Sequence, residues 1–405
     1  MTAVHAGPAG GARQAGPPSP AWLRRYLNAA DFERAAQRRL PRIVHEFVSG
    51  GSEDGVSLRA NRADFERIAL RPRGLAAVAN VSQQVELWGR RYSSPIGVAP
   101  MGVSAICRKE CDLHLARAAH AARIPFILSG ASTFPMERLQ QETPGIWYQA
   151  YLPGDTQRLG RILARLERAR IEVLVVTSDT AVAGNRENNE RTGFSIPFRP
   201  SMRLALDGVL HPRWLLDVLA RTLLTSGVPR FANLYEEAGP AITEEPAQGF
   251  RGGRDLLTWD HMSWLRERWG GKLVVKGVLH PADAQEACNR GLDAVVVSNH
   301  GGRQLDGALS PILALEAIRQ VLPPAFPVFI DGGFRRGTDV LKAVALGARL
   351  VFVGRPFLYG AAVAGQAGTA RVIEILKSEI QRNLALMGVA ELGRLAEGSA
   401  VVRVG

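Results

Sequence analysis

One pattern repeats along the chain: a short apolar run rich in β-branched residues, then small or polar residues, then a stretch of helical periodicity. Such runs lie at 95–100, 125–130, 146–151, 171–179, 272–277, 293–302, 327–333 and 349–356. Runs that are apolar throughout are typical of parallel strands buried on both faces. Eight of them alternating with helices predict an α/β fold, a (β/α)₈ barrel. A doubly wound sheet is the alternative, but no GxGxxG motif supports it.

The repeat is interrupted once, between Thr177 at the end of the fourth run and Lys276 in the fifth. This gap predicts a long insertion after strand 4, at about 188–255. Within it, 206–227 has the pattern of an amphipathic helical segment, with Pro212 suited to a helix start and Gly227 to a helix end. Two interpretations stay open: a helix packed on the barrel, or a basic amphipathic segment on a membrane surface.

The two ends of the chain differ from the repeat. Residues 1–21 are rich in glycine and proline and predict a flexible tail. The segment from Asp31 to Val48 is helix-like around Pro41. We therefore expect one barrel domain over 22–395 and a short C-terminal tail over 396–405.

Composition supports a globular protein, because 46% of the residues are hydrophobic and 22% are charged. The net charge of +12 comes almost wholly from arginine. Arginine suits carboxylates, phosphates and anionic lipid head groups. The arginines are scattered and no nucleic-acid motif is present, so we expect no nucleic-acid partner.

Three cysteines, at 107, 111 and 288, are too few and too odd for a disulfide scaffold and fit a reducing compartment. Cys107, Cys111 and His114 lack a fourth ligand at suitable spacing, so we predict no metal site. No apolar run reaches the roughly 18 to 20 residues that span a bilayer, and no signal peptide is apparent. We expect a cytoplasmic protein, with peripheral contact with the cytoplasmic face of a membrane left open.

Polar residues and glycines follow every predicted strand. In a (β/α)₈ barrel the reacting residues stand at the C-terminal ends of the strands, on one rim. Taken singly, each such residue can cap a helix or form a turn. Their convergence predicts an active site made of Pro100, Met101, Gly102, Ser129, Gln149, Tyr151, Thr177, Asp179, Lys276, Ser298, His300, Arg303, Asp331, Gly333, Gly354 and Arg355.

The last two strand ends, IDGGFRRG (330–337) and VGRP (353–356), suggest an anion site, because backbone N–H groups with Arg335 and Arg355 can surround a phosphate. Lys276 lies in an otherwise apolar strand and needs an anionic partner. Asp331 could serve, and so could an electron-accepting ring that becomes negative.

Asp179 could orient the imidazole of His300 and raise its basicity, as general-base chemistry requires. Arg186 and Arg303 offer two guanidinium groups for bidentate capture of a carboxylate. A surface salt bridge is the alternative role for Arg186.

The motif SNHGGRQLDG (298–307), with IDGG.RRGTDV and VGRP downstream, resembles the FMN-dependent 2-hydroxy acid dehydrogenases and oxidases, a family that includes glycolate oxidase and lactate and mandelate dehydrogenases. The resemblance runs from about Leu40 to Met387. It implies that FMN lies against Pro100, Met101 and Gly102, with Ser129, Gln149 and Thr177 at its polar edge. It also implies that Lys276 stabilises the reduced flavin beside Ser298. The residues implied to hold the ribityl chain and phosphate are Asp331, Gly333, Arg335, Gly354 and Arg355.

The implied reaction is oxidation of an (S)-2-hydroxy acid to a 2-oxo acid with reduction of FMN. His300, supported by Asp179, is implied as the base that removes a proton from either Cα or the hydroxyl group. Arg303 and Arg186 bind the carboxylate in this scheme, and Tyr151 bonds to the substrate oxygen.

One position departs from the family. A helix ending LP…VYDY carries a tyrosine that contacts the substrate carboxylate, whereas this chain has LPRIVHEF. We take His45 to stand at the position of that tyrosine, and therefore expect it to bind substrate.

Two features are similar to the mandelate dehydrogenase branch. Gly130 and Ala131 stand where glycolate oxidases carry a bulky tryptophan, which suggests a bulky or aromatic substrate. The insertion is also similar to that of the mandelate dehydrogenases, in which it associates with a membrane and electrons pass towards quinone. This similarity suggests membrane contact through 195–235. An oxidase that produces H₂O₂ from O₂, and a flavin-binding protein without catalysis, are the alternatives; a homotetramer is what the family suggests.

Overall fold

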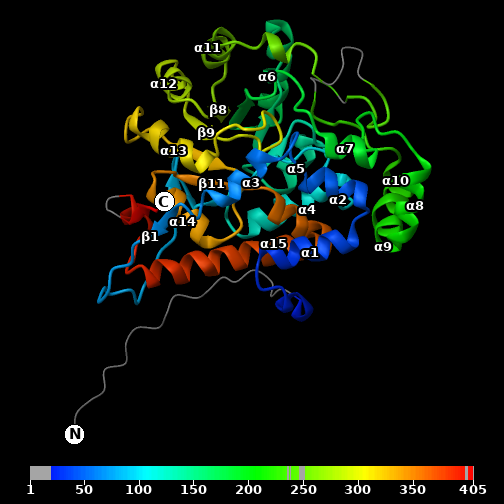
Figure 1. Ribbon diagram of the computed structural model, residues 1–405. Coiled ribbons are helices and arrows are strands. Elements are labelled where there is room, and N and C mark those ends of the chain that lie inside the picture. Colours follow the sequence, from blue (N-terminus) through cyan, green and yellow to red (C-terminus); the bar gives the residue numbers. More distant parts are fainter. Residues whose placement is uncertain (1–19, 235–236, 238, 246–250, 397–399, 405) are drawn as a thin grey trace.

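The computed structural model describes residues 20–234, 237, 239–245, 251–396 and 400–404 (Figure 1). All eight predicted runs are confirmed as strands of one parallel sheet: β4 (Ile96–Val98), β5 (Ile127–Ser129), β6 (Trp147–Ala150), β7 (Val173–Thr177), β8 (Lys272–Val278), β9 (Ala294–Val297), β10 (Val328–Asp331) and β11 (Leu350–Val353). Their order is β4-β11-β10-β9-β8-β7-β6-β5. Val98 donates its backbone N–H to the carbonyl of Pro125 at 2.9 Å and bridges to Phe126, which brings β4 next to β5 and closes the barrel.

Aromatic side chains fill the N-terminal end of the barrel. The rings of Trp147, Phe329 and Phe352 pack with centroids 5.4 to 5.9 Å apart. Trp88 covers them at 5.5 Å from Trp147, held on the turn between β2 (Val85–Leu87) and β3 (Arg90–Tyr92). Because these aromatic rings fill the N-terminal end of the barrel, a functional site can form only at its C-terminal end.

Helices cover the outside of the barrel, as the alternating pattern predicts. They are α4 (Cys111–Ala121), α5 (Met136–Glu142), α6 (Thr156–Arg168), α11 (Trp259–Arg268), α12 (Pro281–Asn289), α13 (Pro311–Gln320), α14 (Gly337–Ala345) and α15 (Arg355–Leu386). The last of these is two helices joined by a kink at Ala364 and Gly365. Three single-turn 3₁₀ segments add to the covering layer: η2 (Ser104–Ile106), η4 (Arg254–Leu256) and η5 (Leu392–Leu395).

The N-terminal segment packs on this layer. It comprises η1 (Ala21–Arg25), α1 (Ala29–Arg39), α2 (Arg42–Ser49) and α3 (Val56–Ala63). Pro41 separates α1 from α2, so the predicted helical segment around this proline is confirmed as two helices. Figure 1 shows α1 lying beside α15.

The two predicted tails have different outcomes. Residues 1–19 lie outside the described residues, and η1 begins within the predicted tail, at Ala21. At the other end, β12 (Val401–Arg403) pairs antiparallel with β1 (Ile68–Leu70). Within the predicted C-terminal tail over 396–405, residues 401–403 therefore form a strand whose partner, β1, lies far earlier in the chain.

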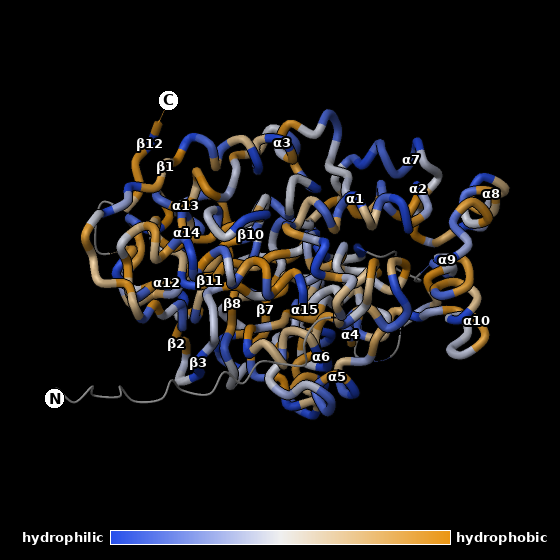
Figure 2. Tube along the Cα trace, turned by 90° about the horizontal axis from the view of Figure 1, so that it is seen from below, coloured by the Kyte–Doolittle hydropathy of each residue, from blue (hydrophilic) through white to orange (hydrophobic). Residues whose placement is uncertain are grey.

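The insertion after β7 holds α7 (Glu187–Thr192), α8 (Met202–Leu210), α9 (Pro212–Trp214), the π-helical η3 (Leu215–Ala220) and α10 (Arg221–Ser226). Pro212 begins the second helical run and Gly227 ends it with a φ of 69°, as predicted. Trp214 is buried and donates its indole N–H to the carbonyl of Ile106 at 2.7 Å. One face of the insertion therefore packs on the barrel, and Figures 1 and 2 show these helices at one edge of the molecule.

A search for membrane-crossing helices over the described ranges finds none with sufficient length and apolar character.

Candidate active site

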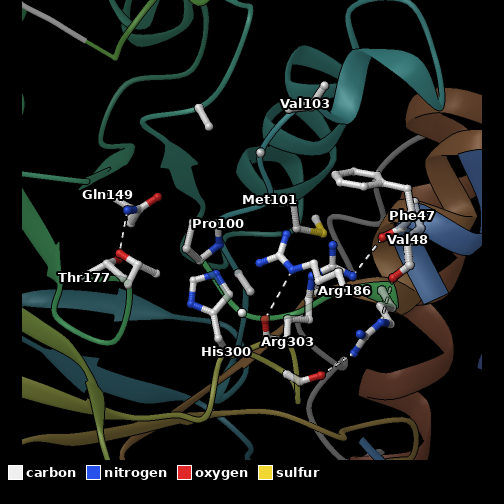
Figure 3. A pocket seen from close by; sticks show the side chains of 18 of the residues that line it. Phe47, Val48, Pro100, Met101, Val103, Gln149, Thr177, Arg186, His300 and Arg303 are labelled. Atoms are coloured by element: carbon white, nitrogen blue, oxygen red, sulfur yellow. Dashed lines mark hydrogen bonds between the residues drawn. The ribbon is translucent and has the colours of Figure 1, made fainter. Parts of the chain in front are cut away.

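A cavity of about 600 Å³ opens at the C-terminal end of the barrel strands (Figure 3). The predicted residues that line it are Pro100, Met101, Gly102, Gln149, Tyr151, Thr177, Arg186, Lys276, His300, Arg303, Asp331, Gly333, Arg335, Gly354 and Arg355. Ser129, Asp179 and Ser298 lie behind this lining and hydrogen-bond to Gln149, His300 and Lys276 respectively. The barrel thus brings together residues from positions 100 to 355 of the chain.

His300 and Asp179 form the predicted pair. Nδ1 of His300 lies 3.0 Å from Oδ1 of Asp179, and Gln304 donates its amide to the carbonyl of Asp179 at 2.8 Å. With Nδ1–H assigned as donor to the carboxylate, Nε2 carries the lone pair that can accept a proton.

The electrostatic setting suits a base. Burial lowers the pKa of His300, and the charge and hydrogen bond of Asp179 only partly offset this. For Asp179, burial acts to raise the pKa, but His300 outweighs it and the pKa lies below its usual value. At neutral pH the imidazole is therefore neutral and the carboxylate is charged, which is the state that a general base needs.

Lys276 has the anionic partner that its burial requires. Its ammonium lies 2.8 Å from Oδ2 of Asp331 and donates to Oγ of Ser298 at 2.8 Å. Burial alone would lower the pKa of Lys276, but Asp331 and Asp179 raise it above its ordinary value, so the lysine stays charged. The other oxygen of Asp331 is buried and accepts no hydrogen bond among the described residues. That acceptor is available to a hydroxyl group of a bound cofactor.

The loops after β10 and β11, for which the sequence predicts an anion site, lie side by side in the cavity wall. Gly333 has a φ of +81°, and a Cβ there would lie 1.9 Å from the carbonyl oxygen of Asn61. Arg355 is fixed by donation to the carbonyls of Val48, Gly50 and Gly301. Burial and the neighbouring Arg335 lower the pKa of Arg355 to about 10, so it remains protonated at neutral pH.

Within the described ranges no carboxylate lies within 4 Å of the guanidinium group of either Arg335 or Arg355. Two part-buried guanidinium groups beside glycine backbone, with no carboxylate at either, are the pattern that a phosphate group satisfies.

Arg303 and Arg186 form a second cationic group. Arg303 donates through Nη1 to the carbonyls of Phe47 and Gly50, at 2.8 and 2.9 Å. Arg186 donates through Nε to the carbonyl of Arg303 at 3.2 Å. Neither forms a salt bridge with any described residue, so the surface salt bridge considered for Arg186 is not what the structure contains. Figure 3 shows both side chains beside His300.

His45 does not lie where we expected. It is buried on α2, is absent from the described cavity lining, and its ring stacks 6.2 Å from that of Tyr359 on α15. Phe47 lines the cavity instead. Residues two apart on a helix point about 200° apart, so only one of the two can face the site. The expectation that His45 binds substrate is therefore corrected, and Phe47 takes its place in the cavity wall.

On the side of the cavity away from Phe47, hydrogen-bonding side chains line the wall (Figure 3). Gln149 donates to Oγ1 of Thr177 at 2.8 Å and accepts from Oγ of Ser129 at 3.1 Å. A Cβ on Gly102 would lie 2.9 Å from Cβ of Ala131, so the backbone comes close at this point. This edge matches the polar edge that the family resemblance implies for a flavin.

An apolar wall completes the cavity, and sequence reasoning missed most of it. Val103, Phe231 and Leu234 form a small buried cluster that Phe47 and Ile196 pack against. Phe47 also stacks on Phe194 at 4.2 Å. Phe194, Ile196, Phe231 and Leu234 come from the insertion, whose path no periodicity predicts. The insertion also supplies Arg251 and Arg254 to the lining, and these too were missed.

Comparison with known proteins agrees with this geometry. The sequence model of the FMN-dependent dehydrogenase family matches residues 36–402. The chain is 39% identical to (S)-mandelate dehydrogenase of Pseudomonas putida over 371 residues, 91% of this chain and 92% of that one. It is 35% identical to L-lactate dehydrogenase of Azorhizobium caulinodans over 381 residues, 92% and 97% of the two chains.

Solved structures give the same result. The monotopic membrane protein (S)-mandelate dehydrogenase superposes with a TM-score of 0.84 at 35% identity, covering 94% of this chain and 100% of that one. Mandelate oxidase with (S)-2-phenylpropionate gives 0.77 at 33% identity, covering 92% and 97%. The barrel, the His300–Asp179 pair and the two arginine sites thus stand in a chain that belongs to the FMN-dependent 2-hydroxy acid dehydrogenase family, with FMN as its cofactor.

Proposed function

We propose that this protein oxidises an (S)-2-hydroxy acid with a bulky or aromatic side chain, such as (S)-mandelate, to the 2-oxo acid. The observation that carries the proposal is one cavity that combines the His300–Asp179 pair, the guanidinium groups of Arg186 and Arg303, and an apolar wall. Base, carboxylate site and aromatic side-chain site are the three things that such a substrate needs. The relatives named for mandelate support the aromatic assignment.

The described residues fit FMN. Arg335, Arg355, Gly333 and Gly354 would hold the phosphate, the orphaned oxygen of Asp331 a ribityl hydroxyl, and Lys276 with Ser298 the flavin ring. Pro100, Met101 and Gly102 would lie against the ring, with Ser129, Gln149 and Thr177 at its polar edge. When bound, FMN supplies the site with an acceptor for two electrons.

The protein groups then divide the work. Arg303 and Arg186 bind the substrate carboxylate, and Tyr151 directs its hydroxyl to the substrate oxygen. His300 accepts a proton at Nε2, from Cα or from the hydroxyl group. Asp179 stabilises the imidazolium that forms, since its charge opposes the effect of burial on the pKa of His300.

Anaerobic mixing tests this assignment. The FMN-loaded protein is mixed with glycolate, lactate, (S)-mandelate, (R)-mandelate and 4-hydroxymandelate while the flavin absorbance is followed. We expect fast bleaching by (S)-mandelate and 4-hydroxymandelate, slow bleaching by glycolate, and none by (R)-mandelate. His300→Ala should retain FMN but lose bleaching. A yellow protein that no 2-hydroxy acid bleaches would support the flavin-binding alternative.

We further propose that electrons pass to a quinone at a membrane rather than to O₂. Large apolar side chains are exposed on the outer side of α8, η3 and α10, here called the insertion surface: Met202, Leu206, Val209, Leu210, Leu216 and Leu224, which are 62 to 87% exposed. Arg203 of α8, Arg213 of α9 and Arg221 of α10 add positive charge that suits anionic head groups. Figure 2 shows α8, α9 and α10, with many hydrophobic positions, at one edge of the molecule.

Vesicle sedimentation and oxygen reactivity test these parts. We expect the protein to sediment with phosphatidylglycerol vesicles and the double substitution Leu210→Ser, Leu224→Ser to abolish this. Leu75→Ser, at a still more exposed leucine outside the insertion, should leave sedimentation unchanged. Reoxidation of the reduced protein by O₂ at the turnover rate, with H₂O₂ formed, would favour the oxidase alternative. The cytoplasmic face of the membrane and the homotetramer stay predictions, the latter to be checked by mass photometry.

A further inference from the structure

Residues 251–254, at the end of the insertion, form a strap that is fastened to two loops of the cavity. The N–H of Gly154, after β6, donates to the carbonyl of Gly253 at 2.7 Å. Arg251 donates through Nη1 to the carbonyls of Thr180 and Val182, after β7, at 3.3 and 3.0 Å. The approach is close, because a Cβ on Gly154 would lie 2.5 Å from the carbonyl oxygen of Leu256. The strap is therefore held against the site along its length.

Both arginines of the strap line the cavity. The guanidinium of Arg254 lies over the ring of Tyr151, 4.1 Å from its centroid. Arg251 lies within electrostatic range of Tyr151 and Asp179, which oppose the lowering of its pKa by burial. The strap thus faces the same part of the cavity as the residue assigned to the substrate oxygen.

Arg251 has unused binding capacity. Among the described residues, Nη1 makes its two carbonyl bonds, Nε and Nη2 make none, and no carboxylate lies within 4 Å. After burial, the charge of Arg251 is the largest factor that lowers the pKa of Arg186. Two neighbouring guanidinium groups that repel each other in a part-buried site are stabilised when an anion joins them.

We propose that Arg251 binds the carboxylate of the substrate together with Arg186, as a third cationic contact beside Arg303. This inference rests on the proposed function, because it names a further residue for the same substrate. The carbonyl bonds through Nη1 fix the direction of the guanidinium, and Nε and Nη2 are left for the carboxylate oxygens. The segment that carries the insertion surface thereby also contributes to substrate binding.

Ligand binding to the FMN-loaded protein tests the proposal. Calorimetry would measure Kd for phenylacetate, which has the carboxylate and the ring, and for phenylacetamide, the analogue in which an uncharged amide replaces the carboxylate. We expect Arg251→Met to weaken phenylacetate binding about tenfold or more and to leave phenylacetamide within twofold, since only the anion uses the charge. Arg251→Lys should give an intermediate Kd, because lysine keeps the positive charge but cannot donate two parallel hydrogen bonds to a carboxylate.

Arg230→Met is the matched control. Arg230 also belongs to the insertion, but it pairs with Glu244 and does not line the cavity among the described residues. Its removal should leave both Kd values unchanged, which separates direct contact from the loss of one unit of net charge. For turnover of (S)-mandelate, Arg251→Met should raise KM by the same factor while kcat stays within twofold.

Two results would overturn the assignment of Arg251. Equal weakening of the acid and the amide would show that the residue only fastens the strap, and unchanged binding of both would show that it does not contact the ligand. FMN content and thermal unfolding of each variant establish that the fold is intact. Failure of the proposed function is distinct, because then the wild-type protein itself binds no phenylacetate and is bleached by no 2-hydroxy acid.

Discussion

At the scale of single residues, the site depends on charges that are buried with their partners. Lys276 and Asp331 compensate each other, and Asp179 compensates the imidazolium of His300. The arginines instead donate to backbone carbonyls and keep their charge for ligands. A site organised in this way is cationic before any anion enters, which suits both a phosphate and a carboxylate.

Asp179→Asn should change both the rate and its pH dependence. The carboxylate raises the pKa of His300 against the effect of burial, so its loss lets that pKa fall further. Because the base acts in its neutral form, the acidic limb of kcat/KM should move to lower pH. We expect kcat to fall by about a hundredfold, since the imidazolium loses its partner.

A second His–Asp pair provides the control for this experiment. Asp207 lies 3.3 Å from His211 in the insertion, outside the described lining of the cavity. Asp207→Asn should leave kcat and the pH profile unchanged. A limb of kcat/KM that stays in place in Asp179→Asn would contradict the assigned role of Asp179.

The two aromatic positions of α2 should respond differently to substitution. Phe47→Tyr places a hydroxyl group on a ring that lies 5.2 Å from the guanidinium carbon of Arg303, and we expect about tenfold tighter binding of the hydroxy acid. His45→Phe keeps the ring beside Tyr359 and should leave KM unchanged. Steady-state kinetics of the two variants test these expectations. A larger change of KM in His45→Phe than in Phe47→Tyr would contradict the orientation of α2.

At the scale of elements, the chemistry depends on how closely backbone segments approach one another after each strand. The loop after β10 is the tightest case, because Gly333 lies directly against Asn61 of α3. Helix α3 belongs to the N-terminal segment, so a part of the chain outside the barrel repeat shapes the proposed phosphate site.

Gly333→Ala should impair cofactor retention more than any neighbouring glycine substitution. The added methyl group would lie 1.9 Å from the carbonyl oxygen of Asn61, and the φ of +81° strains any side chain. We expect the purified protein to contain much less FMN and to regain it only at high FMN concentration. Gly307→Ala has a similar φ of 76° but open space around it, and should lose far less FMN.

At the scale of the whole molecule, the buried carboxylate of Asp112 lowers stability. Asp112 is buried in the first turn of α4 and accepts from Oγ of Ser132 at 2.5 Å. Burial nevertheless raises its pKa to about 6. Between its unfolded and folded pKa values the unfolded chain binds fewer protons, so this group makes the protein less stable as pH rises from about 4 to 6.

Asp112→Asn should therefore stabilise the protein at neutral pH. The raised pKa corresponds to about 2 to 3 kcal/mol in the free energy of unfolding above pH 7, and to none below pH 4. Urea unfolding of the FMN-loaded variant and wild type at pH 4.5, 6 and 7.5 measures the difference. A gain that does not grow with pH would contradict the buried, ionising carboxylate.

The sequence alone determined the barrel and most of the chemistry. Buried parallel strands need continuous apolar runs, and their ends must meet on one rim, so periodicity located all eight strands and the residues that follow them. Strand ends are fixed by the register of the sheet, which is why the strand pattern could predict that His300, Asp179, Lys276 and Asp331 lie together at the rim.

Tertiary structure decided what lies off the strands. His45 and Phe47 point about 200° apart on α2, and sequence spacing cannot show which of the two faces the cavity. The insertion returns Phe194, Phe231, Leu234 and Arg251 to the site through loops that have no periodic pattern. The pairing of 401–403 with β1 likewise depends on contacts between opposite ends of the chain. Local pattern therefore determined where the candidate site lies, and long-range packing determined the shape and charge of the cavity proposed for the substrate.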